Sequence, residues 1–93
     1  MQQINLQQLQ ELLNSHQPPQ LIDVREPFEH EAYNIGGTLI PLADIIKSAA
    51  IIPTDKPVVI YCRKGIRSQI AIQRLEAKFG YNNLINLQGG VEK

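Results

Sequence analysis

The sequence predicts an α/β domain with a small, mostly parallel sheet and helices on both of its faces. Short apolar runs typical of buried strands alternate with segments of helical periodicity. Parallel strands need crossover connections, and helices usually provide them. The 93 residues suffice for one small domain, and 43% hydrophobic and 19% charged residues are typical of a globular chain.

The first half of the chain is expected to contain two helices and two extended segments. Asn5 is a suitable N-cap, and three leucines after it share one helical face: Leu6, Leu9 and Leu13. Residues 20–24 form an apolar run expected to be a buried strand. Pro27 and the acidic residues around it predict a second helix. A brief extended segment is expected at residues 38–41.

The second half is expected to continue this alternation. Residues 42–50 predict a helix, and the β-branched run at residues 58–62 predicts a strand buried on both faces. A further helix is expected from near Ser68 to the C-cap Gly80, with three residues on its core stripe: Ala71, Leu75 and Phe79. Residues 83–88 predict the last strand.

The composition excludes several classes of function. Nine basic and nine acidic residues cancel, so we expect no binding to nucleic acid or to an anionic membrane. No apolar run approaches the ~18 residues needed to span a bilayer. Residues 1–13 lack the basic start and apolar block of a secretory signal. We therefore expect a cytoplasmic protein.

A single cysteine excludes an internal disulfide and a metal cage built from cysteines. His16 falls in an expected loop and His30 in an acidic helix, and neither has a partner at ligand spacing. We therefore expect no metal. Glu29, His30 and Glu31 are expected to lie on a solvated helix face.

Cys62 stands where the best predicted strand meets the next loop. Ligands of open parallel sheets bind beyond the carboxyl ends of the strands, so its sulfur should lie at the ligand edge, facing a helix N-terminus. A loop bent back at Gly65 can direct several backbone N–H groups at one anion. Helix N-termini and nearby cations also favour the thiolate form. This pattern indicates a nucleophilic cysteine with an anionic substrate.

The same residues have a simpler interpretation. A lone cysteine at the end of a buried strand is often a small hydrophobic core residue. Residues 56–75 hold five basic residues and no acidic one, and residues 23–31 hold four acidic residues, which also fits two solvated faces. Three features favour the reactive cysteine: its position between a strand and a helix, the glycine in the middle of the loop and the flanking cations. The spacing of the residues alone still leaves both interpretations open.

Three segments in order, "LIDVREPFEHEAYNIGGTLIPL", "VVIYCRKGIRS" and "LINLQGG", resemble the rhodanese-like domain family, specifically its single-domain members. The resemblance covers residues 21–90. It implies a five-stranded parallel sheet flanked by helices. It also implies a cysteine that accepts a sulfane sulfur from thiosulfate or a similar donor and passes it to cyanide or another thiophilic acceptor. No metal or organic cofactor is implied.

The resemblance also assigns the site. Cys62 corresponds to the persulfide-forming cysteine, and the rest of the active-site loop is Arg63, Lys64, Gly65, Ile66 and Arg67. The loop's backbone N–H groups are expected to hold the persulfide. Its arginines are expected to bind the oxygen atoms of the donor, because a guanidinium fork suits a sulfonate-like group. Ser68 corresponds to a small hydroxyl residue and is expected mainly to act as an N-cap.

Asp23, Arg25 and Glu26 correspond to the family's DxRE motif. We expect them to form an ion-pair and hydrogen-bond cluster that fixes the strand-to-helix turn beside the active-site loop. The family continues past Gly90 with a helix that carries a tryptophan, whereas this sequence ends at Lys93. We expect one rhodanese-like domain over residues 1–93, either without that helix or with its packing completed otherwise. Reduced stability or self-association is the expected consequence.

Other functions of this fold stay open. The dual-specificity phosphatases that share it have five residues between cysteine and arginine, but four separate Cys62 from Arg67, and the shorter loop favours sulfur over phosphate. Phosphatase or arsenate reductase is therefore the less favoured alternative enzyme. Rhodanese-like domains also serve as binding or regulatory modules, typically where the cysteine is lost. A sulfur-carrier role is intermediate between an enzyme and a binding module: Cys62 would receive sulfur from a protein donor such as a cysteine desulfurase and pass it to an acceptor. The expected partners are thus a small anionic sulfur donor and a protein donor or acceptor.

Overall fold

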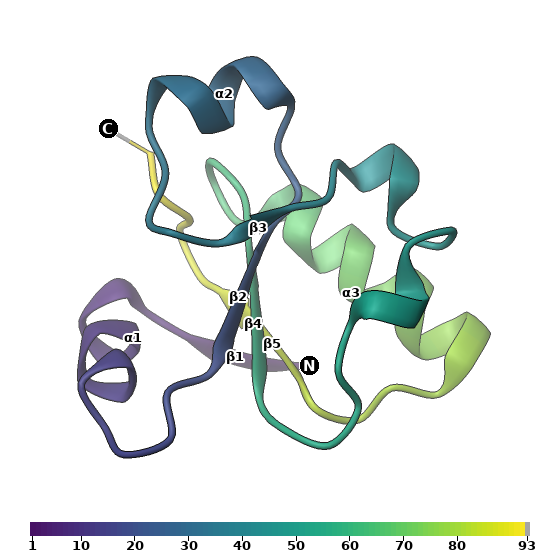
Figure 1. Ribbon diagram of the computed structural model, residues 1–93, viewed down its shortest axis with the longest axis horizontal. Helices are drawn as coiled ribbons and strands as arrows, with labels where there is room; N and C mark the ends of the chain where they lie inside the picture. Colours follow the sequence, from purple (N-terminus) through teal and green to yellow (C-terminus); the bar gives the residue numbers. More distant parts are fainter. Residues whose placement is uncertain (93) are drawn as a thin grey trace.

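The computed structural model describes residues 1–92, which form a five-stranded sheet with helices on both faces (Figure 1). The strands are β1 (Gln2–Ile4), β2 (Gln20–Asp23), β3 (Thr38–Leu39), β4 (Val58–Tyr61) and β5 (Leu84–Leu87). The helices are α1 (Leu6–Leu13), α2 (Pro27–Ala32), α3 (Ile66–Phe79) and two 3-10 turns, η1 (Leu42–Asp44) and η2 (Ala49–Ile51). The strand order is β1-β5-β4-β2-β3, and every neighbouring pair is parallel. The predicted fold class is confirmed.

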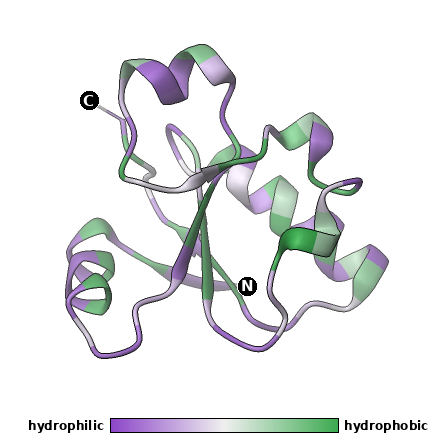
Figure 2. Cartoon of the chain, viewed as in Figure 1, coloured by the Kyte–Doolittle hydropathy of each residue, from purple (hydrophilic) through white to green (hydrophobic). Residues whose placement is uncertain are grey.

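Two hydrophobic cores lie on the two faces of the sheet. On one face, α3 and the segment with η1 and η2 cover the strands, with a core that includes Ile22, Ile45, Val58, Ile60, Ile72 and Leu75. On the other face, α1 covers a smaller core that includes Leu9, Leu21, Val59, Tyr61, Ile85 and Leu87. Figure 1 shows α1 and α3 on opposite sides of the strands, and Figure 2 shows hydrophobic residues along the central strands. The central strand β4, buried throughout, leads directly to Cys62.

Several local signals produce the structure that they predict. Asn5 caps α1, because its side chain accepts a hydrogen bond from the backbone N–H of Gln8 at 2.8 Å and the Gln8 side chain accepts one in return. Pro27 lies in the first turn of α2. Gly80 ends α3 with a φ of +73°. Strands occur within four predicted segments: residues 20–24, 38–41, 58–62 and 83–88.

The helix expected over residues 42–50 is not formed. The segment holds η1 and the start of η2 instead. Its β-branched isoleucines and Ser48 have low helix propensity, and Ile45 is fully buried against the sheet. Packing against the sheet therefore decides the path of this segment.

Two more predictions are wrong in detail. Helix α3 begins at Ile66 and its N-cap is Gly65, so Ser68 is not the N-cap that we expected. Strand β1 was not predicted, because three residues carry little periodic signal. Three residues expected on core stripes are exposed at the ends of their helices: Leu6, Leu13 and Phe79.

No helix within residues 1–92 combines the length and hydropathy that crossing a membrane requires. Over the same range, His, Cys, Asp and Glu side chains form no group of three that could hold a metal ion. The expected reduced stability or self-association rests on the end of the sequence at Lys93, which lies outside the described residues, and it stays a prediction.

Candidate active site

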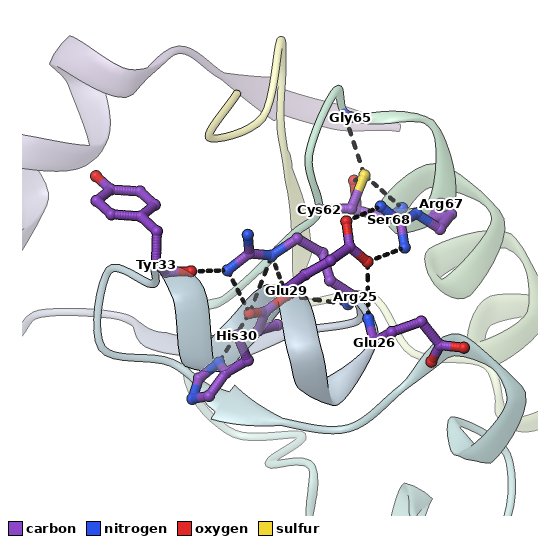
Figure 3. A network of polar contacts seen from close by, with 10 residues as sticks. Arg25, Glu26, Glu29, His30, Tyr33, Cys62, Gly65, Arg67 and Ser68 are labelled. Carbon is purple, nitrogen blue, oxygen red and sulfur yellow. Dashed lines mark hydrogen bonds and ion pairs between the residues drawn. The ribbon is translucent and has the colours of Figure 1, made fainter. Parts of the chain in front are cut away.

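Cys62 follows β4 directly and is 1% exposed. Its sulfur accepts a hydrogen bond from the backbone N–H of Gly65 at 3.0 Å and a longer one from that of Ser68 at 3.4 Å (Figure 3). Ser68 is the third residue of α3, where backbone N–H groups lack partners within the helix. The sulfur therefore caps the start of a 14-residue helix, whose dipole favours negative charge at this end.

The loop after Cys62 takes its shape from two glycines. Gly65 has a φ of +91°, and a Cβ there would lie 3.1 Å from the backbone of Leu87 and Gly89. Gly90 approaches the loop from the other side, where a Cβ would lie 2.4 Å from the carbonyl oxygen of Cys62. The backbone N–H of Val91 donates to that oxygen at 3.0 Å. The turn after β5 thus holds the base of the active-site loop.

A hollow of about 230 Å³ lies over the loop and is lined by Cys62, Arg63, Lys64, Ile66 and Arg67. The structure thus gathers the predicted site residues at one place, with Gly65 contributing its backbone N–H. The side chains of Arg63 and Lys64 are 58% and 62% exposed and lie 3.6 and 3.9 Å from a carboxylate oxygen of Glu92. These weak, exposed contacts leave both cations accessible to an anion in the hollow.

Arg67 differs from the other two cations because its guanidinium is bound by Glu29 of α2. Nη1 and Nη2 of Arg67 donate to the two carboxylate oxygens at 2.7 and 2.9 Å. The hydrogen bonds from Arg67 lower the pKa of Glu29 to about 2, and the Glu29 carboxylate raises the pKa of Arg67. The prediction of a solvated Glu29 is therefore wrong. Binding of a donor by Arg67 stays a prediction.

The DxRE cluster has the geometry expected of a structural element (Figure 3). Arg25 donates to the fully buried carboxylate of Asp23 through Nε and Nη2, the latter at 2.8 Å, and its backbone N–H donates at 3.0 Å. Burial alone would raise the pKa of Asp23, but the hydrogen bonds from Arg25 and His30 outweigh it and lower the pKa. Nη2 of Arg25 also donates to the carbonyl oxygen of Tyr33. Through His30 and Tyr33 the cluster ties the end of β2 to the C-terminal part of α2. Glu26 does not join it as expected: it is the N-cap of α2, and its backbone N–H donates to a side chain of that helix.

Two residues of this site were missed by the sequence reasoning. His30 was expected on a solvated face, but its Nδ1 lies 2.8 Å from Oδ2 of Asp23. Asn86 of β5 is fully buried and hydrogen-bonded to Ser68, whose hydroxyl lies 3.4 Å from the sulfur of Cys62. An isolated asparagine within an apolar strand was the available signal for Asn86. No comparable local signal identifies His30.

A second hollow, of about 330 Å³, lies beside the first and shares Arg63 with it. Its apolar wall includes Phe28 and Tyr33 of the α2 region and Val91 of the C-terminal segment. Phe28 is 72% exposed. The active-site loop is thus bordered by a hollow in which apolar residues lie beside four charged ones: Arg25, Glu29, Arg63 and Glu92.

Comparison with known proteins agrees with this arrangement. The model of the rhodanese-like domain family matches residues 5–93. The protein YqhL of Bacillus subtilis is 42% identical over 85 residues, which cover 90% of this chain and 67% of YqhL. A sulfurtransferase of Allochromatium vinosum is 36% identical over 90 residues, covering 96% of this chain and 83% of that protein. The crystal structure of a rhodanese-like domain protein from Staphylococcus aureus matches with a TM-score of 0.87 and 30% identity over 97% of this chain and 87% of that one.

Some relatives are much longer. The probable adenylyltransferase/sulfurtransferase MoeZ of Mycobacterium tuberculosis is 34% identical over 91 residues, which cover 95% of this chain and 23% of MoeZ. The chain thus spans about a quarter of that relative's length. With the family match over nearly its whole length, the five-stranded parallel sheet and the cysteine loop at its carboxyl edge, the chain belongs to the rhodanese-like domain family, which includes sulfurtransferases.

Proposed function

We propose that the protein is a sulfurtransferase that carries sulfane sulfur as a persulfide on Cys62. The thiolate attacks the outer sulfur of thiosulfate, a Cys62 S–S bond forms, and sulfite leaves with the electron pair of the broken bond. Cyanide or a thiolate acceptor then takes the outer sulfur, and the electron pair of the Cys62 S–S bond returns to Cys62. No cofactor takes part, and one cysteine suffices because the acceptor comes from outside.

The observation that carries this proposal is the position of the Cys62 sulfur between the N–H groups of Gly65 and Ser68, at a hollow lined by cations. A persulfide extends the side chain by one atom and places its negative charge near the loop amides. N–H groups fixed in the resting structure stabilise such a charge without further reorganisation. Arg63 and Lys64 are the accessible cations for a dianionic donor.

Two-substrate kinetics test the proposed reaction. We expect parallel double-reciprocal lines when thiosulfate and cyanide are varied together, because the persulfide exists between the two half-reactions. Converging lines would contradict a persulfide that outlives release of sulfite. A Cys62→Ser variant should lose thiocyanate formation completely, while its far-ultraviolet circular dichroism remains that of the wild type.

A second candidate is transfer of sulfur from one protein to another through the same persulfide. The second hollow, with the exposed Phe28 beside charged residues next to the active-site loop, favours this function, because a small inorganic donor does not need such a surface. MoeZ, whose name combines adenylyltransferase and sulfurtransferase, is a longer relative in which the matching region is one part. A cysteine desulfurase with cysteine should then load Cys62 faster than thiosulfate does. Equal or slower loading would favour the small donor.

Two further expectations remain proposals. We place the protein in the cytoplasm, because a reducing compartment keeps an unpaired catalytic cysteine as a thiol. We regard phosphatase or arsenate reductase activity as disfavoured, because four residues separate Cys62 from Arg67 and Glu29 binds the guanidinium of that arginine. Hydrolysis of p-nitrophenyl phosphate that depends on Cys62 would reverse this preference.

A further inference from the structure

A buried polar network connects Cys62 with strand β5. Asn86 is fully buried in a strand whose other residues are apolar: Leu84, Ile85 and Leu87. An amide in such a place lowers stability unless its polar atoms are hydrogen-bonded. Its Oδ1 accepts a hydrogen bond from Oγ of Ser68, which is itself fully buried and 3.4 Å from the sulfur. The three side chains form one chain of contacts, with the sulfur at its end.

The neighbours of Asn86 fix the direction of these hydrogen bonds. Its Nδ2 donates to Oε1 of Gln3 at 3.0 Å and to the carbonyl oxygen of Gly65 at 3.4 Å. A carbonyl oxygen can only accept, so the amide nitrogen faces Gly65 and the amide oxygen faces Ser68. The hydroxyl of Ser68 has one hydrogen, and Oδ1 takes it. Ser68 therefore presents lone pairs to the sulfur of Cys62, and these are acceptors for the S–H of the thiol form.

We propose that Asn86 is a positioning residue that opposes ionisation of the free Cys62 thiol by holding the hydroxyl hydrogen of Ser68. In the thiol form, the S–H hydrogen of Cys62 has Oγ of Ser68 as its acceptor, and the hydroxyl hydrogen of Ser68 has Oδ1 of Asn86. A thiolate would be stabilised by a hydroxyl turned towards it, but that turn leaves the buried Oδ1 of Asn86 without its donor.

The consequence for sulfur transfer rests on the proposed function. In the persulfide the negative charge lies on the outer sulfur, one atom farther from Ser68, so the orientation of the hydroxyl matters less. The pair of Ser68 and Asn86 thus disfavours the free thiolate more than the sulfur-loaded form. When an acceptor attacks the outer sulfur, Sγ of Cys62 leaves with the electron pair as a thiolate, so Ser68 and Asn86 slow loss of the bound sulfur by making Cys62 a poorer leaving group.

The other charged and titratable groups of this region stay in place during the test. The loop contributes Arg63 and Lys64, and α3 contributes Arg67. The others are Glu29 and His30 of α2, Asp23 and Arg25 at the end of β2, and Glu92 of the C-terminal segment. The N–H groups of Gly65 and Ser68, which favour the thiolate, are also retained. Differences between variants at Ser68 and Asn86 therefore report on the hydroxyl.

Alkylation by iodoacetamide tests the proposal, because the chain has one cysteine and the rate reports on Cys62 alone. The rate is measured against pH for the wild type, Asn86→Val, Ser68→Ala and the double variant. We expect Asn86→Val to lower the pH of half-maximal rate by about one unit, or about tenfold more thiolate at a given pH, because the hydroxyl is released towards the sulfur. In the Ser68→Ala background, Asn86→Val should cause no shift, since no hydroxyl is left to release.

An unchanged or higher half-maximal pH in Asn86→Val would overturn the proposal, as would an equal shift in the Ser68→Ala background. If Asn86→Val does not fold, Ser68→Ala decides alone. If Ser68 presents lone pairs to the sulfur, as we propose, Ser68→Ala lowers the pH of half-maximal rate. If its hydroxyl instead donates to the thiolate, Ser68→Ala raises that pH, and the proposal is wrong. Alkylation needs no sulfur donor, so failure here is distinct from failure to form a persulfide.

Discussion

Replacing Glu29 with glutamine isolates the ion pair that joins α2 to the active-site loop. Glutamine keeps the length of the side chain and an oxygen that can accept from the backbone N–H of Glu26, as Glu29 does at 2.9 Å. It removes the charge that faces the guanidinium of Arg67. Glu31 on the same helix is exposed, so Glu31→Gln is a matched control for the loss of one negative charge.

The pKa of Glu29 gives the magnitude. Hydrogen bonds from Arg67 lower it from 4.5 to about 2. A shift of that size corresponds to a ceiling of about 3 kcal/mol. The Arg67 side chain is 34% exposed, so solvent screens the pair. We therefore expect Glu29→Gln to reduce the free energy of unfolding at pH 7 by about 1–2 kcal/mol, or roughly 5–10 °C in Tm.

The pH dependence follows from the lowered pKa. The ion pair stabilises the folded state fully above pH 4.5 and loses its contribution as pH falls towards about 2. The stability difference between wild type and Glu29→Gln should thus shrink to roughly half or less between pH 7 and pH 3. Urea unfolding followed by circular dichroism measures both differences. A difference near zero at pH 7, or one of the same size at pH 3, would refute this reasoning.

Three other variants have defined outcomes. Gly90→Ala places a Cβ 2.4 Å from the carbonyl oxygens of Cys62 and Arg63 at a φ of +63°, so we expect it to reduce the free energy of unfolding by about 3 kcal/mol or more. Gly80→Ala, with open space around the new Cβ, should reduce it by about 1 kcal/mol, and equal reductions in urea unfolding would contradict the close approach at Gly90. Arg63→Ala should raise the KM for thiosulfate several-fold with little change in kcat, and about 0.5 M salt should reduce this difference in KM between variant and wild type. An unchanged KM would show that Arg63 does not bind the donor. Asn5→Ala removes the cap of α1 and should reduce the free energy of unfolding by about 1 kcal/mol, a loss that a stability within error of the wild type would disprove.

Sequence reasoning succeeded where a local interaction decides the structure. The caps Asn5 and Gly80 act within one turn of their helices, and the strand before Cys62 is a continuous β-branched and aromatic run. The loop at Gly65 needs a positive φ, which glycine adopts readily. These features brought the predicted site residues to one edge of the sheet.

The remaining features depend on contacts between distant residues. Strand β1 is three residues long and exists because it pairs with β5, more than 80 residues later. Glu29 and Arg67 are 38 positions apart, and no periodicity connects them. Ser68 was interpreted as an N-cap from its local sequence alone, whereas its hydrogen-bond partner Asn86 lies on β5, 18 residues later. Such pairs form only when the strands are assembled and α2 and α3 are packed on the sheet.

Intact-protein mass spectrometry after incubation with thiosulfate tests the central claim most directly. We expect the wild type to gain the mass of one sulfur atom and to lose it again when cyanide is added. Cys62→Ser, the matched control, should gain none. Absence of the adduct from a folded wild type that also remains unmodified with a cysteine desulfurase and cysteine would contradict a persulfide on Cys62.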